Sequence, residues 1–91
     1  MLKETYTKPF KKQYKLMIKR GMKIEKLIEV MQMIINEQPL PPEYCNHPLH
    51  GEWEGSYDCH IQGDWVLIYE IDKKVNNVVF HRTGTHSDLD I

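Results

Sequence analysis

The sequence predicts an α+β domain in which two N-terminal helices pack on one face of a small antiparallel sheet, in the order β-α-α-β-β-β. Two stretches of the first half repeat apolar residues at helical spacing, and a cluster of prolines follows them. The second half contains strand-like runs separated by turn residues. Residues 1–91 are expected to form one domain, since this length suffices to bury a modest core.

A short edge strand is expected first, over residues 2–7, because these residues alternate weakly and Lys8-Pro9 follows them. A helix then begins, with one face formed by Phe10, Tyr14, Met17 and Ile18. Gly21 supplies its stop. The second helix has the clearest periodicity in the chain, through Ile24, Leu27, Ile28, Met31, Ile34 and Ile35.

A loop follows the second helix, because the prolines of Gln38-Pro39-Leu40-Pro41-Pro42 lack the backbone donor that a helix needs. Three strands are predicted beyond this loop, over Ser56–Ile61, Asp64–Ile71 and Val78–Thr83. Turns at Gln62-Gly63 and Asp72–Asn77 connect them. With both helices on one face of the sheet, the opposite face is expected to be open for a site.

Charge is divided unevenly along the chain, although the formal net charge is only -1. Residues 1–26 contain nine lysines and arginines against two acids, and residues 27–91 contain three against eleven. The basic end suits docking on nucleic acid or on an acidic protein partner. A solvated, lysine-rich helix face is an equally good interpretation.

The cysteines and the hydropathy indicate a soluble cytoplasmic protein with no membrane partner. Cys45 and Cys59 are too few for a disulfide framework, and neither belongs to a CxxC motif, so both are expected to be reduced. The N-terminus lacks the apolar segment of a signal peptide, and no apolar run is long enough to cross a bilayer.

The predicted strands carry several acid–base residues. Strand periodicity places Asp58 and His60 on one face, together with Ser56. A carboxylate beside an imidazole can fix the tautomer that proton transfer needs. Asp64 and Trp65 follow the next turn, where Asp64 can hydrogen-bond a histidine and Trp65 can pack beneath it or stack on a base. For Trp65 alone, core packing is the better interpretation.

Arg82 and His86 stand at the end of the last predicted strand, four positions apart. The guanidinium of Arg82 offers a planar fork of donors that matches phosphate oxygens. RNA brings its own nucleophile, the 2′-OH, so cleavage needs only a base, an acid and a cation. Histidines titrate near neutral pH and can fill both proton-transfer roles. A single histidine is more often an ordinary surface residue, but the combination suits cleavage of an RNA phosphodiester.

Zinc binding is the alternative use of these side chains, since Cys45, Cys59 and the histidines near them offer soft ligands. No pair has the short CxxC or HxxxH spacing typical of zinc sites, and Pro48 restrains the loop between His47 and His50. The sequence therefore predicts no metal site and no cofactor.

Three segments in this order resemble the YafQ branch of the RelE/ParE toxin superfamily: His47-Pro48-Leu49 with Gly51, Asp58 and His60 before Asp64-Trp65, and Arg82-Thr83-Gly84-Thr85-His86. The resemblance covers nearly the whole chain. It implies the fold of that family and the activity of an mRNA interferase of a type II toxin–antitoxin system. Such toxins cut mRNA in the ribosomal A site and are silenced by an antitoxin, so the implied partners are a cognate antitoxin, the ribosome and mRNA.

The same resemblance implies which residues act. It assigns catalysis to His47, His60, Asp64 and His86. It assigns phosphate and RNA contacts, direct or supporting, to Arg82, Trp65 and Asp58. Within this set His86 is expected to be the acid. Either His47 or His60 is expected to be the base, with Asp64 orienting a histidine.

The chain departs from the family in two respects. Family members commonly end in an aromatic residue that can contact the nucleobase, whereas this chain has Leu89-Asp90-Ile91. Acids that would repel RNA also stand near the site in sequence, at Glu52, Glu54, Asp88 and Asp90. Three alternatives therefore stay open: a binding toxin of the gyrase-inhibiting kind, a catalytically degenerate toxin, and a histidine or zinc interaction module.

Overall fold

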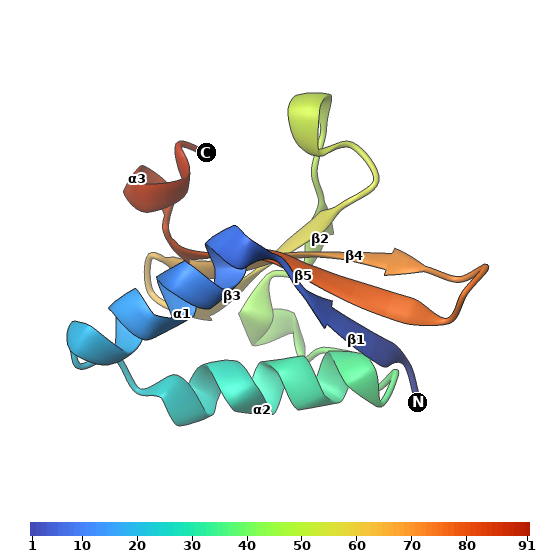
Figure 1. Cartoon of the computed structure of the whole chain (residues 1–91), viewed down its shortest axis with the longest axis horizontal. Coiled ribbons are helices and arrows are strands. Elements are labelled where there is room, and N and C mark those ends of the chain that lie inside the picture. The colour runs from blue at the N-terminus through green and yellow to red at the C-terminus, as the bar shows by residue number, and fades with distance from the viewer.

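A five-stranded sheet with two long helices on one side forms the body of the protein (Figure 1). The computed structural model describes all residues, 1–91. Its helices are α1 (Lys8–Lys19), α2 (Ile24–Ile35) and the short α3 (His86–Leu89). Its strands are β1 (Lys3–Tyr6), β2 (His47–Pro48), β3 (Tyr57–Gln62), β4 (Trp65–Asp72) and β5 (Asn77–Thr85). The short turns η1 (Pro42–Tyr44) and η2 (Gly51–Trp53) lie in the loop between α2 and β3.

The sheet is mixed, with the strand order β1-β5-β4-β3-β2. The strands β2 to β5 pair antiparallel as predicted, but β1 pairs with β5 in parallel. The prediction of a purely antiparallel sheet is therefore wrong at this edge. Two helices and three strands separate β1 from β5 in the chain, and alternation within a strand does not reveal its partner.

Both long helices form where the apolar periodicity predicts them, and the α+β class is confirmed. Thr7 caps α1, since its hydroxyl accepts the N–H of Phe10 at 3.1 Å, and Pro9 stands in the first turn, where no donor is needed. Gly21, with φ +77°, allows the left-handed turn after α1. None of the helices has the length and apolarity that crossing a bilayer requires.

The central strand β4 is buried on both of its faces. Its buried residues run without a break through Trp65, Val66, Leu67, Ile68 and Tyr69. Trp65, Leu67 and Tyr69 belong to the core formed with α1 and α2, while Val66 and Ile68 point to the other side. That second side is covered by other side chains at these two positions, since Val66 and Ile68 are fully buried. In Figure 1, α3 and the loop that carries η2 rise from it, while α2 lies below the sheet.

The two cysteines are free, as predicted. Cys59 of β3 is fully buried in the helix-side core, and this burial raises the pKa of its thiol to about 12. Cys45 is exposed in the loop just before β2. The two thiols thus lie in opposite environments.

Side chains of α1 continue the pairing of β5 beyond the point where β1 ends. The hydroxyl of Thr7 donates to the carbonyl of His81 at 2.8 Å. The side-chain carbonyl of Gln13 accepts the N–H of Thr83 at 3.0 Å. Backbone groups that lack a strand partner are thereby satisfied, and β5 is held along its whole length.

Thr83 links β5 to β4 inside the core, because its hydroxyl donates to the carbonyl of Val66 at 3.0 Å and accepts the indole N–H of Trp65 at 2.9 Å. Thr83→Val keeps the shape and leaves both partners unpaired. We expect it to lower the free energy of unfolding by about 1–3 kcal/mol, measured by urea denaturation. Thr5→Val, which removes an exposed hydrogen bond to Asn77, is the control and should change little. Equal losses in the two variants would contradict the assignment.

Candidate functional site

Three imidazole rings lie in a row on the sheet face opposite the core helices. They belong to His47 of β2, His60 of β3 and His86 of α3. The ring centroids of His47 and His60 are 6.5 Å apart, and those of His60 and His86 are 5.3 Å apart. The fold thus gathers three predicted site residues from three separate segments.

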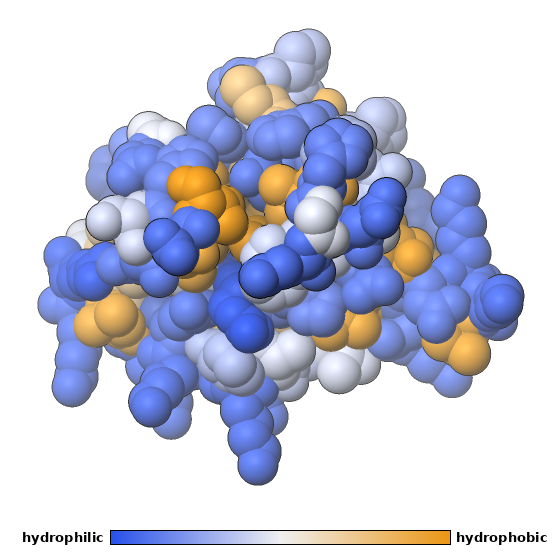
Figure 2. All heavy atoms as spheres, turned by 90° about the horizontal axis from the view of Figure 1, so that it is seen from above, coloured by the Kyte–Doolittle hydropathy of each residue, from blue (hydrophilic) through white to orange (hydrophobic).

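Strand register explains how this face is assembled, because paired residues of neighbouring strands point to the same side of a sheet. One line of paired residues, from β2 inward, reads His47, Asp58, Ile68 and Arg82. The next line reads His60, Val66 and Gly84. Polar groups therefore surround the two buried apolar residues of β4. Figure 2 looks onto this side of the molecule and shows a largely hydrophilic face with scattered hydrophobic patches.

Trp65 lies on the other side of β4 and is only 1% exposed. Its indole is directed into the core, where it bonds Thr83, so it presents no ring face to a nucleobase. Trp65 is therefore a core residue, which was the better interpretation from sequence. Trp65 can affect the site only indirectly, by supporting β4 from the core side.

His86 is held by a carboxylate and by the cap of α3. Its Nδ1 bonds to the carboxylate of Asp64, and this hydrogen bond lowers the pKa of Asp64. The ring nitrogen that remains for chemistry is therefore Nε2. Thr85 and Asp88 form a capping box, in which each side chain accepts the backbone N–H of the other residue.

Asp88 also ties α3 to the end of α1. Its two carboxylate oxygens accept from Nη1 and Nη2 of Arg20, at 2.7 and 3.1 Å. These contacts hold the pKa of Asp88 well below its ordinary value, with the Arg20 hydrogen bonds as the largest cause. A side chain at Gly84 would place its Cβ 3.1 Å from the Asp88 side chain. The glycine between Arg82 and His86 is thus needed for this close approach.

Asp58 contacts His47, its cross-strand partner, and not His60, beside which the sequence placed it. Oδ1 of Asp58 lies at the ion-pair distance of 3.2 Å from Nε2 of His47, and this buried oxygen accepts no hydrogen bond. Nδ1 of the same ring lies 2.8 Å from the carbonyl of Cys45. One nitrogen of His47 is therefore held by a backbone carbonyl, and the other faces a buried carboxylate. His60 contacts both neighbouring rings and makes no side-chain hydrogen bond.

Arg82 follows a β-bulge in β5 and lies on the same face of the sheet as His47 and His60. His81 and Arg82 together oppose Ile68, so β5 has one residue more than β4 at this point. Nη1 of Arg82 donates to the carbonyl of His81 at 2.8 Å. The guanidinium lies over the indole of Trp53, with Cζ 5.2 Å from the ring centroid. Sequence reasoning missed Trp53 and His81, because the contacts of a loop residue and the position of a bulge leave no periodic signal.

No group of three or more histidine, cysteine, aspartate or glutamate side chains lies close enough to hold a metal ion as the side chains stand. The row instead has a histidine–carboxylate pair at each end, His47 with Asp58 and His86 with Asp64. His60 lies between them with free ring nitrogens. This arrangement can take up a proton at one point and release another nearby.

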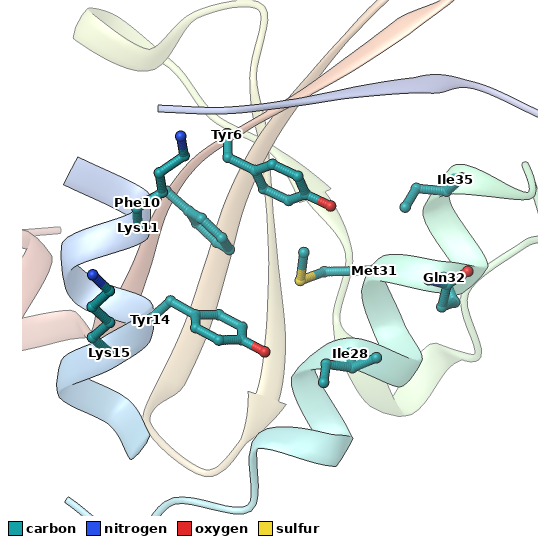
Figure 3. A pocket seen from close by; sticks show the side chains of 9 residues that line it. All are labelled: Tyr6, Phe10, Lys11, Tyr14, Lys15, Ile28, Met31, Gln32 and Ile35. Carbon is teal, nitrogen blue, oxygen red and sulfur yellow. The ribbon is translucent and has the colours of Figure 1, made fainter. Parts of the chain in front are cut away.

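A separate groove of about 360 Å³ lies between α1 and α2, on the helix side of the molecule (Figure 3). Its floor and walls are mainly apolar, formed by Tyr6, Phe10, Tyr14, Ile28, Met31 and Ile35. Lys11, Lys15 and Gln32 also line it. The rings of Tyr6 and Tyr14 each lie within 6.0 Å of the Phe10 ring, centroid to centroid, and form one aromatic wall. The groove and the histidine row are on opposite sides of the sheet.

The fold and the site define a small α+β protein with a row of three imidazoles and an arginine on one face of its sheet. Residues 2–91 match the family model described as the YafQ bacterial toxin of type II toxin–antitoxin systems. The chain therefore belongs to the YafQ toxin family.

Individual relatives agree with this assignment. Over 85 residues the chain is 42% identical to the mRNA interferase toxin YafQ of Escherichia coli strain K12, covering 92% of this chain and 90% of that protein. It is similar to a chain in the crystal structure of the Escherichia coli DinJ–YafQ complex, with a TM-score of 0.90, 39% identity and 98% of both chains covered. It is also similar to a metal-bound toxin from Helicobacter pylori, with a TM-score of 0.91, 37% identity, and 98% and 99% of the two chains covered.

The pair of Asp88 and Arg20 should make stability depend on acid. Because the folded state lowers the pKa of Asp88, the stabilisation is fully present above the ordinary carboxyl pKa of about 4 and is lost as the pH falls below it. We expect Asp88→Asn to cost about 1 kcal/mol in the free energy of unfolding at pH 7. The difference from wild type should shrink toward pH 3 in urea titrations. Asp90→Asn, at an exposed carboxylate without an ion pair, is the control; a difference that stays constant with pH would contradict this role.

Proposed function

We propose that this protein is a toxin that cuts mRNA on the ribosome, in the A site, by histidine acid–base catalysis. The name of its relative as an mRNA interferase supports RNA cleavage. The observation that carries the proposal is the row of three imidazoles with a carboxylate at each end. A cytoplasmic site of action follows from the substrate.

In this proposal His60 is the general base, because its ring nitrogens are free to accept a proton. It removes the proton of the 2′-OH, and the 2′ oxygen attacks the adjacent phosphorus. The bond from phosphorus to the 5′ oxygen breaks, and His86 donates a proton to that oxygen. The products are a 2′,3′-cyclic phosphate and a 5′-OH. Asp64 orients His86 by accepting its Nδ1–H, which leaves Nε2 as the donor.

The transition state carries more negative charge on the phosphoryl oxygens than the substrate does. The guanidinium of Arg82 lies on the same face as the histidines and offers N–H donors to those oxygens. His47 is held between Asp58 and the carbonyl of Cys45, so it is placed as a second donor rather than as the base. These roles use every polar residue that the sequence assigned to the site.

Dependence on the ribosome has a physical rationale in the charges near the site. Glu52, Glu54 and Asp90 are exposed acids in the loop and tail beside the histidines. Acids at the rim repel free RNA, while the lysines of α1 attract it. An mRNA that the ribosome already holds in the decoding site can present its phosphodiester even if the toxin alone binds RNA weakly.

The alternatives from sequence are weaker accounts of the same geometry. A toxin that only binds gyrase has no need of an ordered imidazole row. A zinc module needs converging ligands, which these side chains do not form as they stand. The structure of a metal-bound Helicobacter pylori toxin makes metal effects worth testing, and in our proposal a metal ion at the histidines would compete with proton transfer.

The same proposal includes a cognate antitoxin, as in the complex of YafQ with DinJ. The groove between α1 and α2 offers it an apolar floor edged by Lys11 and Lys15. An acidic, partly disordered segment that folds on binding could bury apolar side chains there and place carboxylates against the lysines.

Cleavage is tested by adding the protein to a cell-free translation reaction with one defined mRNA, with and without ribosomes, and mapping new 5′ ends by primer extension. We expect cuts only with ribosomes, and a loss of about a hundred- to ten-thousand-fold in rate for His86→Ala. His50→Ala, at an exposed loop histidine outside the row, should cut like wild type. No cleavage by folded wild type would favour a degenerate toxin, and a pH–rate profile without two ionisations would contradict the paired-histidine mechanism.

The antitoxin interface is tested by reversing the charge of the two lysines that line the groove. We expect Lys11→Glu with Lys15→Glu to weaken binding of the cognate antitoxin by about ten- to a hundredfold in isothermal titration, and to flatten the salt dependence. Lys73→Glu with Lys74→Glu, on the exposed turn between β4 and β5, is the matched charge control. Affinity that is flat in salt for wild type, or equal weakening in both double variants, would argue against docking in this groove.

A further inference from the structure

We infer that Trp53 is a positioning residue for Arg82, which it holds in the orientation that phosphate stabilisation needs. This inference rests on the proposed function. Trp53 is the last residue of η2, in the loop that rises from the site face of the sheet. Cζ of Arg82 lies 5.2 Å from the centroid of its ring, within the range of a cation–π contact.

The contacts of Arg82 restrict its guanidinium to one place. Nη1 donates to the carbonyl of His81, and Cζ lies over the ring of Trp53. A long arginine side chain would otherwise lose much rotamer freedom on meeting a phosphate. Stacking leaves the other N–H groups in the plane of the guanidinium, where phosphate oxygens approach. Trp53 thus prepares the cation in advance of substrate.

Trp53 is itself fixed by the sheet. Its ring meets the ring of His81 edge-on, with centroids 5.6 Å apart. Nε2 of His81 lies 3.0 Å from the carboxylate of Glu70 on β4. The N–H of Leu49 donates to the carbonyl of Ser56 at 2.9 Å and closes the base of the loop. The bulge at His81 and Arg82 is what allows one indole to touch both side chains.

This placement favours a positioning role over base stacking. The guanidinium already covers one face of Trp53, so a nucleobase could stack on the other face only. A positioning residue acts through Arg82 in the transition state, so its loss should lower kcat more than it raises KM. A base contact would instead change KM.

The experiment measures kcat and KM for ribosome-dependent cleavage by Trp53→Ala, Trp53→Phe, Arg82→Ala and the double variant W53A/R82A. We expect Trp53→Ala to lower kcat by about ten- to a hundredfold, because a misplaced charge loses much of its effect. Trp53→Phe, which keeps an aromatic face, should recover most of the rate. The double variant should be no slower than Arg82→Ala, because Trp53 has nothing left to position. His50→Ala controls for changes in the loop, and circular dichroism verifies that each variant is folded.

Two results would overturn the inference while leaving the proposed function in place. One is a double variant in which the two losses multiply. The other is a Trp53→Ala enzyme with wild-type kcat, whether KM is unchanged or is raised as a base contact would predict. If folded wild-type protein cuts no RNA with ribosomes present, the proposed function fails first and the inference fails with it.

Discussion

Burial of β4 on both faces is the constraint on which the rest of the structure depends. Five consecutive buried residues cannot be covered by helices on one side alone. The helix side takes Trp65, Leu67 and Tyr69, and the far side must also exclude water from Val66 and Ile68. The polar residues of β2, β3 and β5 therefore surround an apolar floor. A site built on such a floor inherits the rigidity of the core, which catalytic geometry requires.

The strand β5 carries Arg82 and leads directly to His86. One side of it pairs with β4, and the other is completed by β1, Thr7 and Gln13. With its ends fixed, the strand can hold a bulge that would otherwise relax. Arg82 follows this bulge on the site face, and the strand then leads directly into the cap that presents His86. Conformational freedom is removed at both groups before any substrate arrives.

Most of the fold was predictable because it depends on local patterns. The α1 and α2 helices follow from apolar periodicity, and β3 to β5 follow from strand runs and turns. The parallel pairing of β1 was not predictable, since its partner β5 is the last strand of the chain and the alternation within β1 does not identify it. For the site, motif spacing indicated His47, His60, Asp64, Arg82 and His86. The pairing of Asp58 with His47, the bulge at His81 and the contact of Trp53 with Arg82 depend on register and on a loop, which no single-chain pattern encodes.

The unequal environments of the two cysteines have a consequence for how the protein meets thiol reagents. Cys59 is sealed in the core with a raised pKa, so the reactive thiolate is scarce at neutral pH. Cys45 is exposed, and its own carbonyl is the group that holds the ring of His47. Alkylating or oxidising agents are thus directed to one point beside the first histidine of the row. A single maleimide dye on the unmodified chain would therefore mark the loop beside His47.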